Sequence, residues 1–264
     1  ASLHVDVYRR SLGFGGERVG SVGRRRRDRH QCRSNYVFQL SSRRAMSDSP
    51  LRSRFGFSDA SIAGFGLTLS GFVGFMGIIT AELLYPEYST RQDISDLGST
   101  RPPDPVIHEP SATVFNTTML VTGAMVLVSA YLLYRVLDRR GFPIALAVFG
   151  LGAFGVGVFP GNVTPWHGLF ALLTFFAGGV TVVLSSRVVS RPFSLLCGLF
   201  GGISLLTLVS VFVFGLAFRA PHPLAFLGGG GIERWVVYPL IVWLPAFGGH
   251  LMATSGDATT ANAD

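Results

Sequence analysis

The stretch FPIALAVFGLGAFGVGVFPGNVTPWHGLFALLTFFAGGVTVVLSS, Phe142–Ser186, decides the fold of this chain. Two long apolar runs in it converge on the turn Phe159–Gly168, where two prolines, an asparagine, a tryptophan and a histidine gather. An apolar run of about 20 residues is long enough to cross the hydrocarbon core of a bilayer as a helix. The stretch therefore predicts two membrane-spanning helices joined by a polar turn at the membrane surface.

The same pattern repeats on both sides of this stretch. With 48% hydrophobic residues and a mean hydropathy of +0.44, the sequence predicts an all-α, polytopic integral membrane protein with a bundle of six transmembrane helices. The predicted spans are Ile62–Glu82, Thr113–Leu137, Phe142–Phe159, Pro165–Ser186, Phe193–Phe218 and Ile232–Met252. We expect Ser58 and Asp59 to cap the first helix, and Thr164 to cap the fourth.

Residues 58–253 are predicted to form the six-helix domain, and the two ends of the chain lie outside it. Residues 1–45 contain 11 arginines and 3 acidic residues, whereas residues 46–264 contain 11 arginines and 12 acidic residues. The formal charge of +7 therefore belongs to the N-terminal segment. We expect a disordered basic tail over residues 1–57, with a natural start at Met46 as an alternative, and a disordered polar tail over 254–264. No nucleic-acid partner is expected for the membrane domain.

Arginines in the loops predict the orientation, because cytoplasmic loops carry an excess of positive charge. With the N-terminus in the cytoplasm, seven arginines lie on the inner side and four on the outer side. The inner set is Arg52, Arg54, Arg135, Arg139, Arg140, Arg187 and Arg191, and the outer set is Arg91, Arg101, Arg219 and Arg234. We therefore expect both termini inside, in a multi-pass protein of the plasma membrane.

Small residues recur at four-residue intervals on two predicted helices, a spacing that lets helices approach closely in lipid. They are Gly66, Ser70 and Gly74 in the first span and Gly198 and Gly202 in the fifth. The segment Gly150–Gly155 (GLGAFG) matches the glycine pattern of dinucleotide-binding loops, but it lies inside an apolar helix without a preceding strand. We interpret its glycines as a packing face. Such faces also suit a homo- or hetero-oligomer.

The predicted outer side collects most polar side chains of the membrane domain. An ionisable group at the end of a membrane helix is costly unless it is paired or solvated. We therefore expect a polar site that opens outward. The candidate residues are Asp93, Asp96, Asn116, Asn162, His167, Glu233 and Arg234.

His167 is the strongest single candidate. In the first turn of a helix, its imidazole lies near the positive end of the helix dipole, which favours the neutral form. A neutral imidazole can act as a base, a hydrogen-bond partner or a metal ligand, and the structural alternative is a histidine that satisfies loop carbonyls. Asn162 has two readings as well, since it can orient His167 or brace the turn.

The charged candidates also have structural alternatives. Asp93 and Asp96 can coordinate a cation or pair with Arg91 or Arg234. Arg234 can bind a phosphate or a loop carboxylate.

Three residues or segments at the helix ends favour structural roles. Glu233 suits the positive end of the sixth helix. Glu82, the acid nearest the membrane, is expected to pair with an outer arginine. The glycine run Gly228–Gly231 predicts a hinge or a close approach of two segments.

Four motifs at the helix ends resemble a known family. They are YPEYSTRQDISDLG after the first span, VFNTTM opening the second, FPGN…HG between the third and fourth, and ERWVVYPLIVW opening the sixth. In their order and placement they resemble the domain of unknown function 998 family, six-span membrane proteins known mainly from archaea and actinobacteria. The resemblance covers roughly Ile62–Met252. It implies the six-helix fold and assigns no activity, cofactor or catalytic residue.

Three classes of function stay open. The favoured class is a non-enzymatic membrane protein that binds a lipid or a partner at its outer face. The first alternative is a lipid- or headgroup-modifying enzyme that uses His167 with acidic residues, and it is less favoured because the sequence holds no recognisable nucleophile or metal quartet. The second alternative is a small transporter, which is disfavoured because no predicted span is broken midway. No cofactor or metal is predicted.

Overall fold

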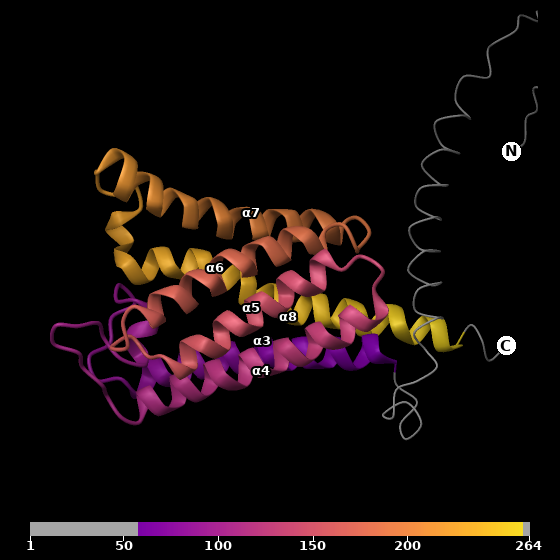
Figure 1. Cartoon of the computed structure of the whole chain (residues 1–264), viewed down its shortest axis with the longest axis horizontal. Helices are drawn as coiled ribbons and strands as arrows, with labels where there is room; N and C mark the ends of the chain where they lie inside the picture. The colour runs from indigo at the N-terminus through magenta and orange to yellow at the C-terminus, as the bar shows by residue number, and fades with distance from the viewer. Residues whose placement is uncertain (1–57, 261–264) are drawn as a thin grey trace, which may run out of the picture. The chain divides into compact units, whose positions relative to one another are not determined.

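Six long helices make up most of the chain that the structure describes (Figure 1). The computed structural model describes residues 58–260, with side chains to Ser255. The helices are α3 (Asp59–Leu84), α4 (Ser111–Val136), α5 (Gly141–Val158), α6 (Trp166–Ser185), α7 (Phe193–Phe212) and α8 (Gly228–Thr260). Residues 58–260 contain no strand, and these six helices are long and apolar enough to cross a membrane. The all-α fold and the six predicted spans are confirmed.

The ends of α7 and α8 extend the predicted pattern. The π-helix η3 (Val213–Phe218) continues α7, and the short 3-10 helix η4 (Ala225–Leu227) precedes α8. The C-terminal tail expected from residue 254 is helical as far as Thr260. The expected basic tail over residues 1–57, including Met46, and residues 261–264 lie outside the described residues.

The two predicted helix caps had different outcomes. Ser58 is the N-cap of α3, and its hydroxyl accepts a hydrogen bond from the Ser61 N–H at 3.1 Å, as expected. The prediction for Thr164 was wrong, because Pro165 is the N-cap of α6 and makes no side-chain capping bond. The carbonyl of Val163 already accepts the His167 N–H at 3.0 Å, so the first turn closes on backbone groups alone.

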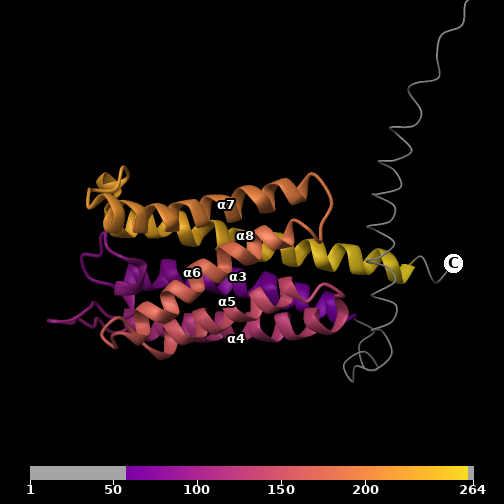
Figure 2. The same ribbon diagram turned by 45° about the horizontal axis from the view of Figure 1, so that its top comes forward.

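Helices that follow one another in the sequence pack side by side in the bundle (Figures 1 and 2). The order runs from α3 to α8, and α8 closes the ring by packing against α3. α8 also contacts α6 across the bundle. Figure 2 shows α7 at one edge, where it packs on α6 and α8.

Large apolar side chains cover the outside of the bundle. Phe72 of α3 is 61% exposed and Leu206 of α7 is 73% exposed. In water, a continuous apolar surface of this kind drives association, whereas in a bilayer it is the surface that contacts lipid tails. Together with the six apolar helices, it identifies a multi-pass membrane protein.

Glycines allow the closest helix contacts. A Cβ atom added at Gly66 of α3 would lie 2.5 Å from the Ser129 Oγ of α4, and one at Gly152 of α5 would lie 2.6 Å from the Thr174 nitrogen of α6. The predicted faces on α3 and α5 are therefore packing faces inside the bundle. The predicted face on α7 is open, because Gly198 and Gly202 have no atom within 4 Å of such a Cβ.

The two ends of the bundle differ in their connections. The connections 137–140 and 186–192 at one end are short. There the Asp59 carboxylate of α3 pairs with Arg135 of α4 at 3.7 Å. The other end holds the connections 85–110, 159–165 and 219–227, and we call it the polar end. Residues 85–110, the longest of these connections, are called the cap below.

Candidate functional site

The cap is a folded segment. Residues Ile94–Leu97 form the 3-10 helix η2. Tyr85, Ile94 and Leu97 are buried and belong to the apolar cluster that includes Phe115 of α4. This packing fixes the cap acids Asp93 and Asp96 over the helix ends instead of leaving them on a mobile tether.

The cap docks directly on the first turn of α8. The Gly230 N–H donates to the Arg91 carbonyl at 2.9 Å. A Cβ atom at Gly230 would lie 1.6 Å from the Gln92 carbonyl oxygen, and Gly228 has a φ of +75° that side chains disfavour. The glycine run is therefore the close approach that the sequence allowed as one of two readings.

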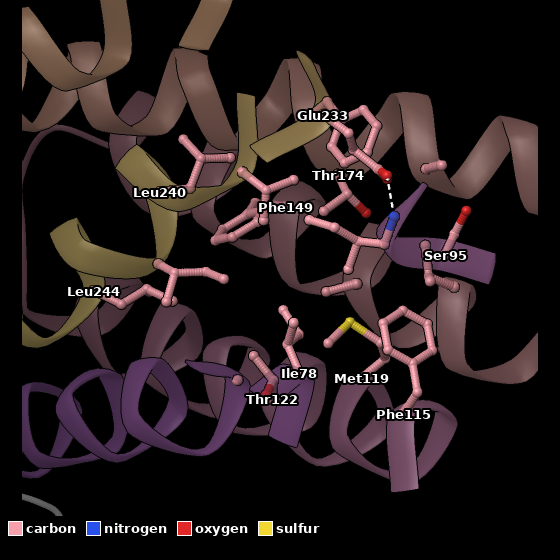
Figure 3. Close-up of a pocket in the computed structure, with 18 of the residues that line it drawn as sticks. Ile78, Ser95, Phe115, Met119, Thr122, Phe149, Thr174, Glu233, Leu240 and Leu244 are labelled. Carbon is pink, nitrogen blue, oxygen red and sulfur yellow. Dashed lines mark hydrogen bonds between the residues drawn. The ribbon is translucent and has the colours of Figure 1, made fainter. Parts of the chain in front are cut away.

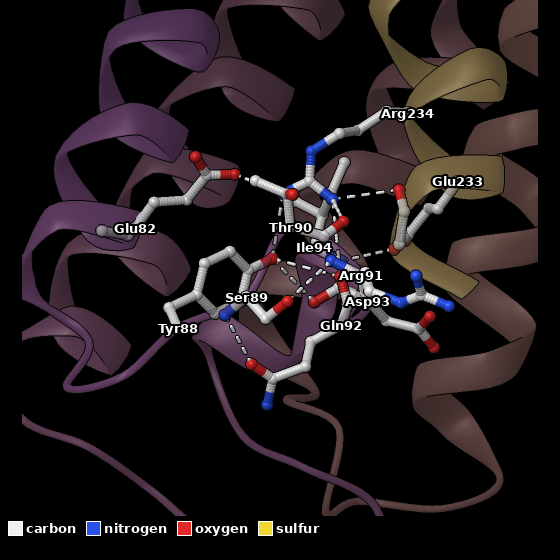
Figure 4. Close-up of polar contacts among 12 residues, drawn as sticks. Glu82, Tyr88, Ser89, Thr90, Arg91, Gln92, Asp93, Ile94, Glu233 and Arg234 are labelled. Atoms are coloured by element: carbon white, nitrogen blue, oxygen red, sulfur yellow. Dashed lines mark hydrogen bonds and ion pairs between the residues drawn. The ribbon is translucent and has the colours of Figure 1, made fainter. Parts of the chain in front are cut away.

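Arg234 fastens the cap to the bundle (Figure 4). One guanidinium nitrogen donates to the carbonyls of Thr90, Gln92 and Gly230, at 2.9, 3.4 and 2.9 Å. The other donates to the Glu82 carboxylate and, at 3.0 Å, to the Tyr88 hydroxyl.

The contacts of Arg234 settle two expectations. The expected pairing of Glu82 with an arginine at its own end of the bundle is confirmed, and Arg234 of α8 is the partner. Both Nη atoms are engaged by protein groups, so this arginine holds the cap and offers little to a phosphate. We call Arg234, Glu82, Tyr88 and the carbonyls of Thr90 and Gln92 the Arg234 latch.

Tyr88 completes the latch as a neutral phenol. Burial raises the pKa of Tyr88 to about 12, with the negative Glu82 and Glu233 adding to the effect and Arg234 opposing it. The protonated hydroxyl lies 3.3 Å from the Gln92 carbonyl and 3.2 Å from the Asp93 carbonyl, to which it donates. In the sequence, Tyr88 stood out only as part of the family motif YPEYSTRQDISDLG. Its hydrogen bonds within the latch depend on the fold of the cap and could not be predicted from the motif.

Glu233 forms a separate contact with the cap. Its Oε2 accepts the Ile94 N–H at 2.5 Å, so the carboxylate holds the cap from the opposite side (Figures 3 and 4). Its Oε1 accepts no hydrogen bond from residues 58–255. Glu233 also lines a cavity beneath the cap.

The two cap acids differ from each other. Asp93 pairs with Arg101 at 2.8 Å, which corrects the expected pairing with Arg91 or Arg234. The fold of the cap decides this, because Arg91 lies on the exposed surface and Arg234 is already engaged. Asp96 forms no ion pair within the described range. Partial burial and, to a smaller extent, the charge of Asp93 raise the pKa of Asp96 above its usual range.

His167 is buried at the start of α6, and within the described residues only one of its ring nitrogens has a hydrogen-bond partner. Nδ1 lies 2.8 Å from the Phe159 carbonyl oxygen, and since a carbonyl only accepts, Nδ1 carries the proton in this contact. In the neutral ring, Nε2 is then an acceptor, and it is buried without a hydrogen bond. The structural alternative, a histidine that satisfies a loop carbonyl, accounts for Nδ1 and leaves Nε2 unexplained.

The two asparagines lie close to the same region. The Oδ1 of Asn116 is buried without a hydrogen bond from residues 58–255, and a Cβ atom at Gly98 of the cap would lie 2.5 Å from it. Asn162 is half-buried in the turn before α6, next to Gly161, which packs on the Ser99 carbonyl of the cap. The cap thus contacts both α4 and the turn that leads to His167.

The structure brings the candidate residues together in two groups. The cap joins Asp93, Glu233 and Arg234 through hydrogen bonds and close contacts at the start of α8. Within the described residues, no hydrogen bond connects His167 or Asn162 to Asp96 or Glu233. No three His, Cys, Asp or Glu side chains of the described chain are arranged to hold a metal ion.

A cavity of about 70 Å³ lies between α3, α4, α5, α6 and α8, below the cap (Figure 3). Its walls are mainly apolar, and Glu233 and Ser95 stand at one end. Sequence reasoning missed this cavity. A signal was present on α8, where Glu233, Val237, Leu240, Ile241 and Leu244 share one helical face that joins an acid to an apolar row.

Comparison of the sequence with known proteins identifies the family of this chain. Residues 68–250 match the family model described as "Protein of unknown function (DUF998)". Comparisons with curated proteins and with solved structures gave no significant match. The matched range covers well over half of the chain and runs from α3 to α8, including the cap and the Arg234 latch. The motif resemblance is thereby confirmed, and the chain belongs to the DUF998 family of proteins of unknown function.

Proposed function

We propose that this protein is a non-catalytic membrane protein that binds, at its polar end, a hydrogen-bond-donating head group of a membrane lipid. The observation that supports this most is an imbalance between acceptors and donors. In the described part of the chain, His167 Nε2 and Asn116 Oδ1 are buried acceptors without partners, whereas both Nη atoms of Arg234 already donate to protein groups. A buried acceptor without a donor costs about 1–3 kcal/mol, so a ligand that supplies a donor is stabilised.

The imbalance favours particular head groups. Ammonium groups and hydroxyl groups donate hydrogen bonds, and the unpaired carboxylate of Asp96 attracts an ammonium further. A head group that offers only phosphate oxygens finds few free donors here. A partner protein that presents the same donors is the alternative occupant of this end.

Catalysis is a weaker reading of the same residues. A histidine that activates a nucleophile forms a hydrogen bond with that nucleophile and is oriented by a third group. In the described chain, the one hydrogen bond of His167 goes to the Phe159 carbonyl. The geometry thus supports binding.

In this proposal, the polar end lies at the extracellular surface of the membrane, and both termini lie in the cytoplasm. The arginine distribution supports this orientation. In a chain carrying Cys32→Ser, we expect Val163→Cys to react with an impermeant thiol reagent on intact cells and Asp138→Cys to react only after lysis. Both positions are exposed, and they lie at opposite ends of the bundle. The reverse labelling pattern would overturn the orientation.

The open face of α7 extends the proposal to association. Gly198 and Gly202 leave room for a second helix, which supports an oligomer through this face. Replacement of both by leucine should lower the fraction of cross-linked dimer in membranes. The matched replacement of Gly201, which faces α6, should instead disturb the fold.

Native mass spectrometry of the full chain with added lipids tests the binding proposal. Phosphatidylethanolamine and phosphatidylglycerol offer donors, whereas phosphatidylcholine shares the phosphate and lacks them. We expect roughly tenfold tighter binding of the first two, because one hydrogen bond to a charged group contributes about 1.5–3 kcal/mol. His167→Phe and Asp96→Ala should remove the preference, and Asp104→Asn in the exposed part of the cap should keep it. Equal binding of all three lipids would overturn the proposal.

A further inference from the structure

The cavity beneath the cap is long and narrow. Its lining on α8 runs from Glu233 to Leu244, eleven residues later, which is about 16 Å along the helix axis. A volume of about 70 Å³ over that length leaves room for a single narrow chain. Each of the five surrounding helices contributes apolar walls, among them Ile78, Met119, Phe149, Phe175 and Leu240.

Two polar groups of the described chain with unused hydrogen-bonding capacity face this cavity. The free Oε1 of Glu233 lies at the end under the cap, and Figure 3 shows this carboxylate beside Ser95. Deeper in the bundle, the Thr122 hydroxyl is buried and has no hydrogen bond to any described residue, although threonine in a helix usually bonds the preceding turn. Buried polar groups are rarely left unpaired, so these two mark places for a bound molecule.

Water suits the lower part of the cavity poorly. An internal water needs two to four polar partners. The hydroxyls of Ser70 and Thr174 are already committed to the carbonyls of Leu67 and Phe170, at 2.8 and 2.7 Å. Apolar walls with so few free polar groups favour an apolar occupant, as dry cavities that bind small hydrocarbons do.

We propose that this cavity binds a single-chain amphiphile, with its apolar chain between the helices and a hydroxyl or ammonium head group donating to Glu233. This inference goes beyond the proposed function, because it uses Glu233 and the cavity instead of His167, Asn116 and Asp96. A carboxyl group in an apolar site is stabilised by a donor or a cation, and within the described residues the only hydrogen bond to Glu233 comes from the Ile94 N–H. A diacyl lipid is too wide for the cavity.

Photoaffinity labelling of the full chain in phosphatidylcholine nanodiscs tests this assignment. The probes are a medium-chain alcohol, the matching amine and the methyl ether of the alcohol, each with a diazirine at the far end of the chain. We expect the alcohol and the amine to label residues near Phe149 and Leu244 at least about tenfold more than the ether, which has no donor. Labelling sites are mapped by peptide mass spectrometry.

Two variants separate the head group from the cavity. Glu233→Gln keeps the size and an acceptor oxygen but removes the charge, so labelling by the amine should fall more than labelling by the alcohol. Ala153→Phe fills the cavity, whereas Leu151→Phe adds the same bulk on the lipid-facing side of α5. Only Ala153→Phe should abolish labelling, and a thermal melt of both variants shows that each is folded.

The outcomes that overturn the inference are distinct. Equal labelling by the ether would refute the role of Glu233. Unchanged labelling in Ala153→Phe would refute the cavity as the place of binding. If the deep residues stay unlabelled while phosphatidylethanolamine still binds in preference to phosphatidylcholine, this inference fails and the proposed function stands. If the deep residues are labelled and the lipid preference is missing, the proposed function fails and the assignment of the cavity stands.

Discussion

Arg234 and His167 lie at the same end of the bundle, and the fold uses them in opposite ways. Both Nη atoms of Arg234 donate, to five groups in all, whereas His167 has one hydrogen bond and, within the described residues, a buried nitrogen without a partner. A polar residue whose hydrogen bonds are all made within the protein stabilises the fold. A buried polar residue with an unsatisfied hydrogen-bonding atom marks a place where a ligand can bind. Both residues were candidates from the sequence, and this difference separates the latch from the binding residues.

Replacement of Arg234 should produce the largest loss of stability. In Arg234→Met, Glu82 keeps its charge in a mostly buried position without a partner, so we expect a loss of about 3–5 kcal/mol in the free energy of unfolding. Denaturant unfolding in detergent micelles measures it. Arg91→Met, at an exposed position of the cap, is the control and should change little. Adding Glu82→Gln should restore part of the loss, and a loss below about 1 kcal/mol in Arg234→Met would mean that the latch does not hold the cap.

The docking of the cap on α8 can be tested without changing a charge. Gly230→Ala places a methyl group against the Gln92 carbonyl and should cost about 1–3 kcal/mol, since overpacking at a close contact displaces backbone. Gly249→Ala is the matched control, because it lies on the same helix with no atom within 4 Å of the added Cβ. Equal melting temperatures for the two variants would contradict the docking.

His167 should behave differently from Arg234. His167→Phe removes the hydrogen bond to the Phe159 carbonyl but also removes a buried nitrogen without a partner. The two effects oppose each other, so we expect a stability change below about 1 kcal/mol. Thermal unfolding of this variant beside Arg234→Met measures the contrast. A destabilisation as large as that of Arg234→Met would show that both residues are structural.

The smallest effect is expected at the exposed ion pair of the cap. Asp93→Asn breaks the pair with Arg101 and should cost less than about 1 kcal/mol. It also removes a negative charge that raises the pKa of Asp96, so that pKa should fall. Carboxylate bands in an infrared pH titration report the shift.

The pH dependence of stability checks the same variant. Because the pKa of Asp96 in the folded protein lies above its unfolded value, its contribution is fully present below the unfolded pKa and is lost as the pH rises through the folded pKa. The stability of Asp93→Asn should therefore decline less as the pH rises through this range. An unchanged pKa of Asp96 would contradict the proximity of the two acids.

The sequence predicted the helices because the length of an apolar run is set by the bilayer. It also predicted the pairing of Glu82 with an outer arginine, since a charge at a membrane helix end requires a partner. The pairing of Asp93 with Arg101 could not be predicted from the sequence, because it depends on the fold of the cap. The cavity was missed for a similar reason: periodicity shows the face of α8, but it does not show that the facing side chains leave space.

The Arg234 latch has a consequence for the synthesis of the protein. Glu82 ends the first membrane helix and Arg234 begins the last, 152 positions later in the chain. At a translation rate of about 5–20 residues per second, on the order of ten seconds pass between the synthesis of the two partners. During that interval the first helix carries an acid without its arginine, and the cap has no surface on which to dock. The polar end is therefore the last part of the bundle to assemble, and it completes only when α8 arrives.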